Sequence, residues 1–292
     1  MNFLQYLING ISLGSVYAII ALGYTMVYGI AKMLNFAHGD VIMVGAYVIF
    51  TIISTMGYPP IVGVVVAVAL CTVLGITIER IAYKPLRNAS SSLAVLITAI
   101  GVSYFLQNMA LIIFGANTKS FNSVVDFGPF TIGGITISGE SLVTVISCIA
   151  IMLILTAFIN KTKAGQAMLA VSEDKGAAVL MGINVNGTIA LTFAIGSGLA
   201  AIAGALLCSA YPSLSPYTGS MPGIKAFTAA VFGGIGSIPG AFIGGILLGV
   251  IEIFGKAYIS SQLSDAIVFA VLIIVLIVKP SGILGKNRQE KV

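Results

Sequence analysis

A polar stretch separates the first two apolar segments of this sequence and carries Asn35, the single histidine His38 and Asp40. Ionisable side chains are costly among apolar residues at membrane depth, so they are candidates for function by default. These residues could contact a polar solute along a pathway, or they could contact another subunit. His38 and Asp40 could also begin a helix at a membrane surface, because Asp is favourable near helix N-termini. Both interpretations stay open.

Two amides, Gln107 and Asn108, lie inside the apolar segment Leu93–Phe114. An amide in such a segment must find a partner, and a bond to a neighbouring helix is usually worth about 1 kcal/mol. Contact with a solute is the alternative. Glu252 and Lys256 stand four residues apart near the end of another apolar segment, which is the spacing of an interfacial ion pair on one helix.

The longest apolar segment, Ile224–Phe254, contains a run of residues that disfavour a helix. Each interior Gly costs a helix about 1 kcal/mol and Pro about 3 kcal/mol relative to Ala. Non-helical backbone at membrane depth is tolerated only beside protein or water, and broken helices of transporters tend to flank the solute site. We therefore expect a hinge or re-entrant element near a translocation route, with Ser237 close to water. Its residues are Gly233, Gly234, Gly236, Ser237, Pro239 and Gly240.

The polar segment of about 160–187 is too long for a turn and has a helical pattern. Ser172, Glu173 and Asp174 are typical of a helix start, and Ala177, Leu180 and Met181 then fall on one face. A short helix with a small-residue face suits docking into a groove on a soluble partner. An ordinary amphipathic surface helix fits the same pattern.

The sequence does not provide the residue combinations that common hydrolytic enzymes need. The sequence contains one histidine and no HExxH motif, which argues against zinc hydrolysis and histidine-assisted serine catalysis. Residues 281–287 lack the spacing of a phosphate-binding loop, so nucleotide hydrolysis would belong to another chain. Cys71, Cys148 and Cys208 lie in apolar runs without CxxC spacing, which indicates small core residues rather than a metal site.

Composition then sets the class of protein. Of the 292 residues, 58% are hydrophobic and 8% charged, and the mean hydropathy is +1.09, whereas a soluble domain is about 25% charged. A polytopic all-α membrane protein follows, because lipid-exposed backbone must satisfy its own hydrogen bonds. The net charge of +5 comes from a few loops without a basic stripe interleaved with aromatics, and so does not indicate nucleic-acid binding. The first five residues carry no Lys or Arg, so we expect the first segment to be retained rather than cleaved as a signal peptide.

About eight apolar spans are expected, and loop charges orient them. The spans are Leu4–Ile30, Val41–Met56, Ile61–Ile81, Leu93–Phe114, Leu142–Ile159, Thr188–Ala210, Ile224–Phe254 and Ala266–Val278. Basic residues gather at 80–87, 161–175 and 279–291, which predicts that these three segments are cytoplasmic. Three expected spans lie between the second and third basic segments, and an odd number of crossings would put these segments on opposite sides. The two can share a side only if Ile224–Phe254 forms two membrane segments, which again indicates a break. Segment 115–140 and the N-terminus are then expected outside.

Glycines spaced by four predict close helix packing in lipid: Gly10 with Gly14, Gly236 with Gly240 and Gly244, and Gly245 with Gly249. The whole chain, residues 1–292, is expected to form a single transmembrane domain.

Several long stretches carry a family resemblance. The stretches are Asn9–Ala18, Gly23–Ile30, Asn35–Gly39, Glu79–Arg87, Lys225–Gly240 and Pro280–Gly285. In this order they resemble the permease subunit of high-affinity branched-chain amino acid ABC importers, over nearly the whole chain.

The resemblance implies a cell-membrane subunit of an ATP-driven importer that takes branched-chain amino acids from an extracytoplasmic solute-binding protein. It also implies a second homologous permease chain and two cytoplasmic ATPase subunits, which would hold ATP and Mg, leaving this chain without a cofactor. The 160–187 loop then looks like the element that couples to the ATPases, through Glu173, Asp174, Lys175, Gly176, Ala177, Ala178 and Gly182. It departs from the usual importer pattern, in which Glu-Ala-Ala is contiguous.

The sequence alone leaves other transport functions open. Related permeases move urea or short amides, and a self-sufficient channel or secondary carrier belongs to a different class. A proton- or sodium-driven carrier would more often place Asp or Glu in mid-span.

Overall fold

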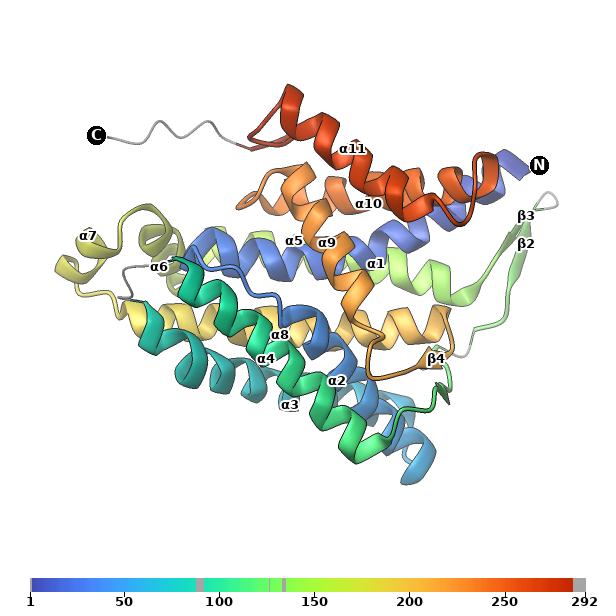
Figure 1. The fold of residues 1–292 in the computed structure, drawn as a ribbon, viewed down its shortest axis with the longest axis horizontal. Coiled ribbons are helices and arrows are strands. Elements are labelled where there is room, and N and C mark those ends of the chain that lie inside the picture. The colour runs from blue at the N-terminus through green and yellow to red at the C-terminus, as the bar shows by residue number, and fades with distance from the viewer. Residues whose placement is uncertain (1, 88–91, 126, 133–134, 286–292) are drawn as a thin grey trace.

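The computed structural model describes residues 2–87, 92–125, 127–132 and 135–285, and the chain is built from apolar helices (Figure 1). The helices are α1 (Asn2–Ala31), α2 (His38–Phe50), α3 (Pro60–Ile78), α4 (Ser92–Phe114), α5 (Gly139–Lys161), α6 (Lys163–Glu173), α7 (Lys175–Leu180), α8 (Val185–Ala210), α9 (Ser220–Gly233), α10 (Ile238–Tyr258) and α11 (Ser264–Val278). A π-helical turn, Thr51–Thr55, extends α2, and Glu79–Tyr83 and Lys84–Leu86 extend α3.

Four short strands complete the described part of the chain. β1 (Lys119–Ser120) pairs antiparallel with β4 (Ser213–Leu214), and β2 (Phe130–Ile132) pairs with β3 (Ile135–Ile137). Neither pair forms a closed sheet. Seven helices are long and apolar enough to cross a membrane, and α11 is a shorter apolar helix of 15 residues. The expected all-α polytopic fold with about eight apolar spans is therefore confirmed.

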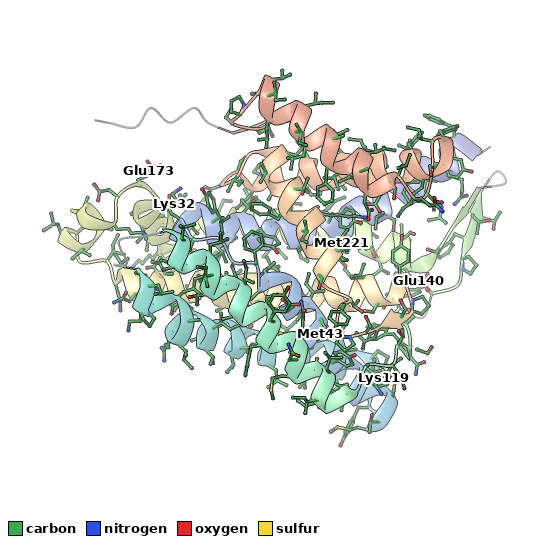
Figure 2. All side chains as sticks on the ribbon, viewed as in Figure 1. Lys32, Met43, Lys119, Glu140, Glu173 and Met221 are labelled. Carbon is green, nitrogen blue, oxygen red and sulfur yellow. The ribbon has the colours of Figure 1, made fainter. Side chains whose placement is uncertain are left out.

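The ends of the helices sort the loops into two groups. In Figure 1, α6, α7 and the end of α11 lie at one end of the bundle, whereas the start of α1, β2 and β3 lie at the other. Figure 2 likewise places Lys32 and Glu173 at the first end and Lys119 and Glu140 at the opposite end. The 161–175 loop and the C-terminal tail therefore share an end, as the loop charges predict, and we refer to this end as cytoplasmic on that basis.

The bundle has a buried centre and an apolar periphery. The most apolar stretch of α1 is 94% buried and that of α8 78%, whereas the corresponding stretches of α3, α4 and α5 are 22–28% buried. Large apolar side chains such as Ile97, Ile112 and Ile154 are exposed on the peripheral helices. Such an apolar exterior suits lipid or another membrane subunit rather than water.

Glycines let α1 and α10 approach at backbone distance. A Cβ atom added to Gly249 would lie 2.2 Å from the backbone N of Gly14, and one added to Gly245 would lie 2.4 Å from the Cα of Ala18. A Cβ added to Gly10 would lie 2.8 Å from the Cα of Val250. The predicted close packing is confirmed, and it joins helices more than 200 residues apart in the sequence.

The expected break in Ile224–Phe254 is also confirmed. Helix α9 ends at Gly233, and Gly234 and Gly236 take φ values of 105° and 93°, which favour glycine. Ser237 then caps α10 by accepting a bond from the N–H of Gly240 at 3.2 Å. Because α10 alone has 21 residues, the break lies at one end of a span. Helix α9, with 14 residues, is too short to cross by itself, and the 211–219 segment that precedes it completes the second pass.

Replacing Gly249 by Ala should destabilise the chain by about 1–3 kcal/mol, because the new methyl group overpacks the α1–α10 contact. Gly101→Ala is the matched control, since nothing lies within 4 Å of a Cβ at this helical position. The control should be neutral or more stable, because Ala favours a helix over Gly by about 1 kcal/mol. Thermal unfolding of the detergent-purified variants measures both effects, and equal midpoints would contradict the backbone contact.

Candidate functional site

Helix α9 begins inside the bundle rather than at its surface. Its 14 residues span about 21 Å, shorter than the hydrocarbon core of about 30 Å. Its start meets the start of α2: a Cβ on Gly219 would lie 1.8 Å from the carbonyl oxygen of Gly39, and one on Gly223 would lie 2.9 Å from the Cα of Gly39. Two helix N-termini therefore converge in the interior.

Polar side chains gather where these helices begin. The Gln107 Nε2 donates to Asp40 Oδ1 at 2.8 Å and lies 3.3 Å from Ser220 Oγ, so three helices meet at one amide. Asp40 and Gln107 are both buried. His38 is buried against Gly23 and packs edge-on against Tyr24, with ring centroids 4.6 Å apart. The structure thus brings together Asp40 and Gln107, which the sequence places 67 residues apart.

The other two polar candidates lie elsewhere. The buried Asn35 accepts a bond from the hydroxyl of Tyr83 at 2.9 Å, which ties the α1–α2 connection to the end of α3. Asn108 is exposed on α4 and donates to the carbonyl oxygen of Tyr104 on its own helix at 2.7 Å.

The hinge residues form a tight turn that contacts α1 and the tail. A Cβ on Gly29 would lie 3.0 Å from the Cα of Gly236. The backbone N–H of Leu284 donates to Gly233, and a Cβ on Gly234 would lie 2.4 Å from the N of Gly285. A Cβ on Gly240 would lie 2.5 Å from the Gly233 oxygen. Ser237 is half-buried and Pro239 is exposed.

The candidate coupling residues lie on two short helices at the cytoplasmic end. Glu173 ends α6, and Asp174 caps α7 by accepting bonds from the N–H groups of Gly176 and Ala177 at 2.7 and 3.0 Å. Lys175 donates to the carbonyl oxygen of Ala31 at the end of α1. Ala178 is buried, and the turn ends at Gly182, whose φ is 78°. The exposed tip of this unit is apolar, with Leu180 at 89% and Met181 at 81%.

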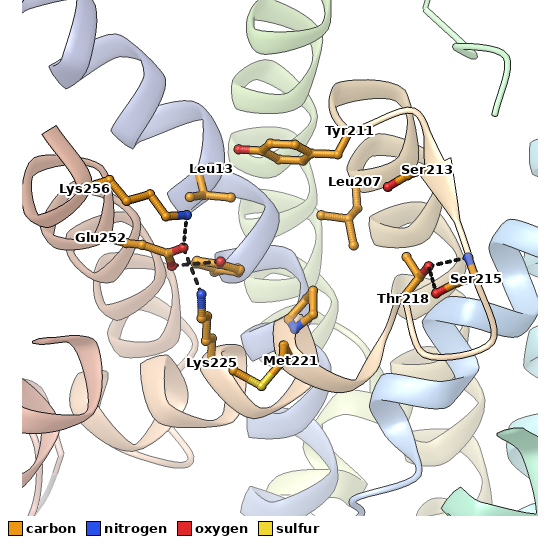
Figure 3. Close-up of a pocket in the computed structure, with 12 residues that line it drawn as sticks. Leu13, Leu207, Tyr211, Ser213, Ser215, Thr218, Met221, Lys225, Glu252 and Lys256 are labelled. Carbon is orange, nitrogen blue, oxygen red and sulfur yellow. Dashed lines mark hydrogen bonds and ion pairs between the residues drawn. The ribbon is translucent and has the colours of Figure 1, made fainter. Parts of the chain in front are cut away.

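A pocket of about 400 Å³ lies on the opposite, outer side of α9. Figure 3 shows its walls, which come from α1, the end of α8, the 211–218 segment, α9 and α10. One part is apolar, with Leu13, Leu207, Met221 and Pro222. Another part carries hydroxyl groups, from Ser213, Ser215 and Thr218 among others.

Charged groups form the remaining wall of the pocket. Glu252 Oε1 accepts bonds from Lys225 Nζ at 2.8 Å and Lys256 Nζ at 2.6 Å, and its Oε2 accepts from the hydroxyl of Tyr17 at 2.9 Å. Lys225 also pairs with Asp265 Oδ1 at 2.7 Å. The side chains of Lys225 and Glu252 are only 8% and 1% exposed. The four charges sum to zero, and the two buried ones are paired, whereas the side chains of Lys256 and Asp265 are 39% and 46% exposed.

The sequence analysis recognised Glu252 with Lys256 but missed Lys225 and Tyr17. Lys225 is the one charged residue within the apolar stretch that becomes α9, and a charge in such a place was the available signal. Its partner Glu252 is 27 residues away, and only the antiparallel packing of α9 on α10 brings the two together. Among the described residues, no group of three His, Cys, Asp or Glu could hold a metal ion.

A helical membrane bundle with a half-helix that begins inside it and a polar pocket beside that half-helix resembles the broken-helix architecture of transporters. The family described as branched-chain amino acid transport system / permease component matches residues 6–276. This chain belongs to that family.

Three relatives illustrate the similarity. The chain is 47% identical to the high-affinity branched-chain amino acid transport system permease protein LivH of Escherichia coli K12, over 100% of this chain and 98% of the relative. It is 44% identical to the permease protein BraD of the corresponding Pseudomonas aeruginosa system, with the same coverage. Identity is 30% to a probable branched-chain amino acid transport permease protein LivH of Methanocaldococcus jannaschii, over 93% and 89% of the two chains.

The buried ion pair generates a stability prediction. Glu252→Ala should destabilise the chain by about 3–5 kcal/mol, because it leaves two lysines without their shared carboxylate. The double variant Lys225→Met/Glu252→Met should recover most of this loss, since the charges that then remain, Lys256 and Asp265, are partly exposed. Thermal unfolding in detergent distinguishes the two, and a double variant no more stable than Glu252→Ala would contradict the pairing.

Proposed function

We propose that this chain is the membrane-spanning subunit of an ATP-driven importer for branched-chain amino acids, which an extracytoplasmic binding protein delivers. The observation that carries this proposal is similarity over the full chain to permeases of branched-chain amino acid systems. The chain works in the cytoplasmic membrane beside a second homologous permease. Two ATPase subunits on the cytoplasmic side bind ATP and Mg and hydrolyse the nucleotide.

Helices α6 and α7 are the coupling element of this proposal. The apolar tip at Leu180 and Met181 is exposed and is the surface that docks on an ATPase. Lys175 holds α7 to the carbonyl end of α1, and α1 packs along α10. Tyr17 of α1 in turn bonds Glu252 of α10. Movement of α7 therefore has a continuous packed route to the pocket.

The translocation route of the proposal runs past the start of α9. The first turn of α9 separates the outer pocket from the Asp40–Gln107 cluster, since Met221 lines the pocket and Ser220 contacts Gln107. Gly39 and Gly219 have no side chains at the point where the starts of α2 and α9 meet. A small shift of α9 therefore changes the separation between the two polar sites. The Gly233–Gly240 turn is the hinge for that shift.

Proteoliposomes that contain only this chain should neither hydrolyse ATP nor accumulate leucine, because the energy source lies in other subunits. Uptake of radiolabelled leucine and release of phosphate measure the two activities. The complete complex with its binding protein serves as the positive control. Accumulation of leucine by this chain alone, driven by an ion gradient, would instead establish a secondary carrier.

Met181→Asp should weaken coupling to the ATPases by at least about tenfold, because it buries a charge in an apolar docking contact. The control is Met56→Asp, which changes another exposed methionine (61%), just after the π-helical turn that extends α2. Both variants should insert and fold normally. The readout is ATPase activity of the complex stimulated by the binding protein, and normal stimulation in Met181→Asp would assign α7 to an ordinary surface helix.

A further inference from the structure

The outer pocket combines features that suit one chemical class of solute. Lys225, Lys256 and Glu252 line it, and Asp265, which pairs with Lys225 from outside the lining, makes this ion-pair network neutral as a whole. A net-neutral dipolar molecule can enter such a site without adding an uncompensated charge, whereas a cation or an anion would add one at membrane depth.

The hydrogen-bonding groups of this wall are arranged for both ends of a zwitterion. The Lys256 side chain is 39% exposed, and an ammonium has three donors, of which one is directed to Glu252. A carboxylate offers about four acceptor sites, and Glu252 uses three of them on Lys225, Lys256 and Tyr17. A carboxylate group on Lys256 and an ammonium group beside Glu252 would therefore extend the network already present.

The opposite part of the pocket is apolar and suits an aliphatic side chain. Leu13, Leu207 and Met221 lie between the charged wall and the 211–218 segment in Figure 3. A volume of about 400 Å³ lies within the range of small-molecule sites, which are typically lined by apolar groups with a few placed polar groups.

We infer that this pocket is the outer reception site of the permease and that it selects aliphatic α-amino acids as zwitterions. Lys256 binds the carboxylate, Glu252 receives the ammonium group, and Leu13, Leu207 and Met221 contact the side chain. The inference rests on the proposed transport function and adds to it the place and the chemistry of recognition. A solute lacking either charged group should not be retained here.

A cysteine at Ser215, which lines the pocket, tests this directly. The native Cys71, Cys148 and Cys208 are fully buried, so they can remain, with the chain lacking the added cysteine as control. The Ser215→Cys complex in nanodiscs is treated with a small water-soluble thiol reagent, alone or with leucine, 4-methylpentanoate or 3-methylbutylamine. Leucine should slow the reaction at least fivefold, and the two single-charge analogues should leave its rate unchanged.

A second variant tests the assigned contact. Adding Lys256→Gln to Ser215→Cys should raise the leucine concentration for half-protection about tenfold, as expected for loss of one hydrogen bond to a charged group. Lys119→Gln, also in the outer part of the chain but outside the pocket, should leave this concentration unchanged.

Three outcomes would overturn the inference: an unreactive cysteine, no protection by leucine, or equal protection by either analogue. ATPase stimulation of the wild-type complex by its loaded binding protein is measured in parallel. Normal stimulation together with any of these outcomes would remove the pocket assignment while leaving the transport function in place. Absent stimulation would count against the transport function itself.

Discussion

Helices α1 and α10 approach so closely that their backbones touch, and the arrangement of the bundle depends on this contact. A Cβ on Gly249 would lie 2.2 Å from Gly14, so even alanine is too large. In lipid no hydrophobic force draws helices together, and close van der Waals packing takes its place. With α1 held against α10, Tyr17 reaches Glu252, and the outer pocket acquires its charged wall.

Glycines also allow a close backbone contact at the start of α9, where Gly219 and Gly223 meet Gly39. Missing side chains there allow α2 and α9 to begin inside the bundle. Carbonyl groups of the preceding turns accept bonds from the N–H groups of His38, Asp40 and Ser220, whereas the buried Nε2 of His38 has no hydrogen-bond partner among the described residues. Glycine thus has two structural effects in this chain. In pairs it brings helices together, and in the 233–240 run it ends one helix before the next begins.

The outer and cytoplasmic ends of the bundle differ in their charges. Lys225, Lys256 and Glu252 line the outer pocket, and with Asp265 beside it they form a network without net charge, which suits passage of a neutral dipolar solute. The cytoplasmic end carries the basic loops, and the exposed apolar tip of α7 projects from it. The long buried helix α1 connects these ends, because it contacts Lys175 at its last turn and Glu252 through Tyr17.

By itself the sequence determined the membrane class, the number of apolar spans, the break at Gly233–Gly240 and the shared end of the basic loops. These features depend on composition, local helix preference and parity, which are properties of neighbouring residues. Only tertiary structure decided three other features. They are the pairing of Lys225 with Glu252, the contact of Asp40 with Gln107, and the start of α9 inside the bundle. Each joins residues from different helices, and which faces of those helices meet depends on backbone distances that no local pattern encodes.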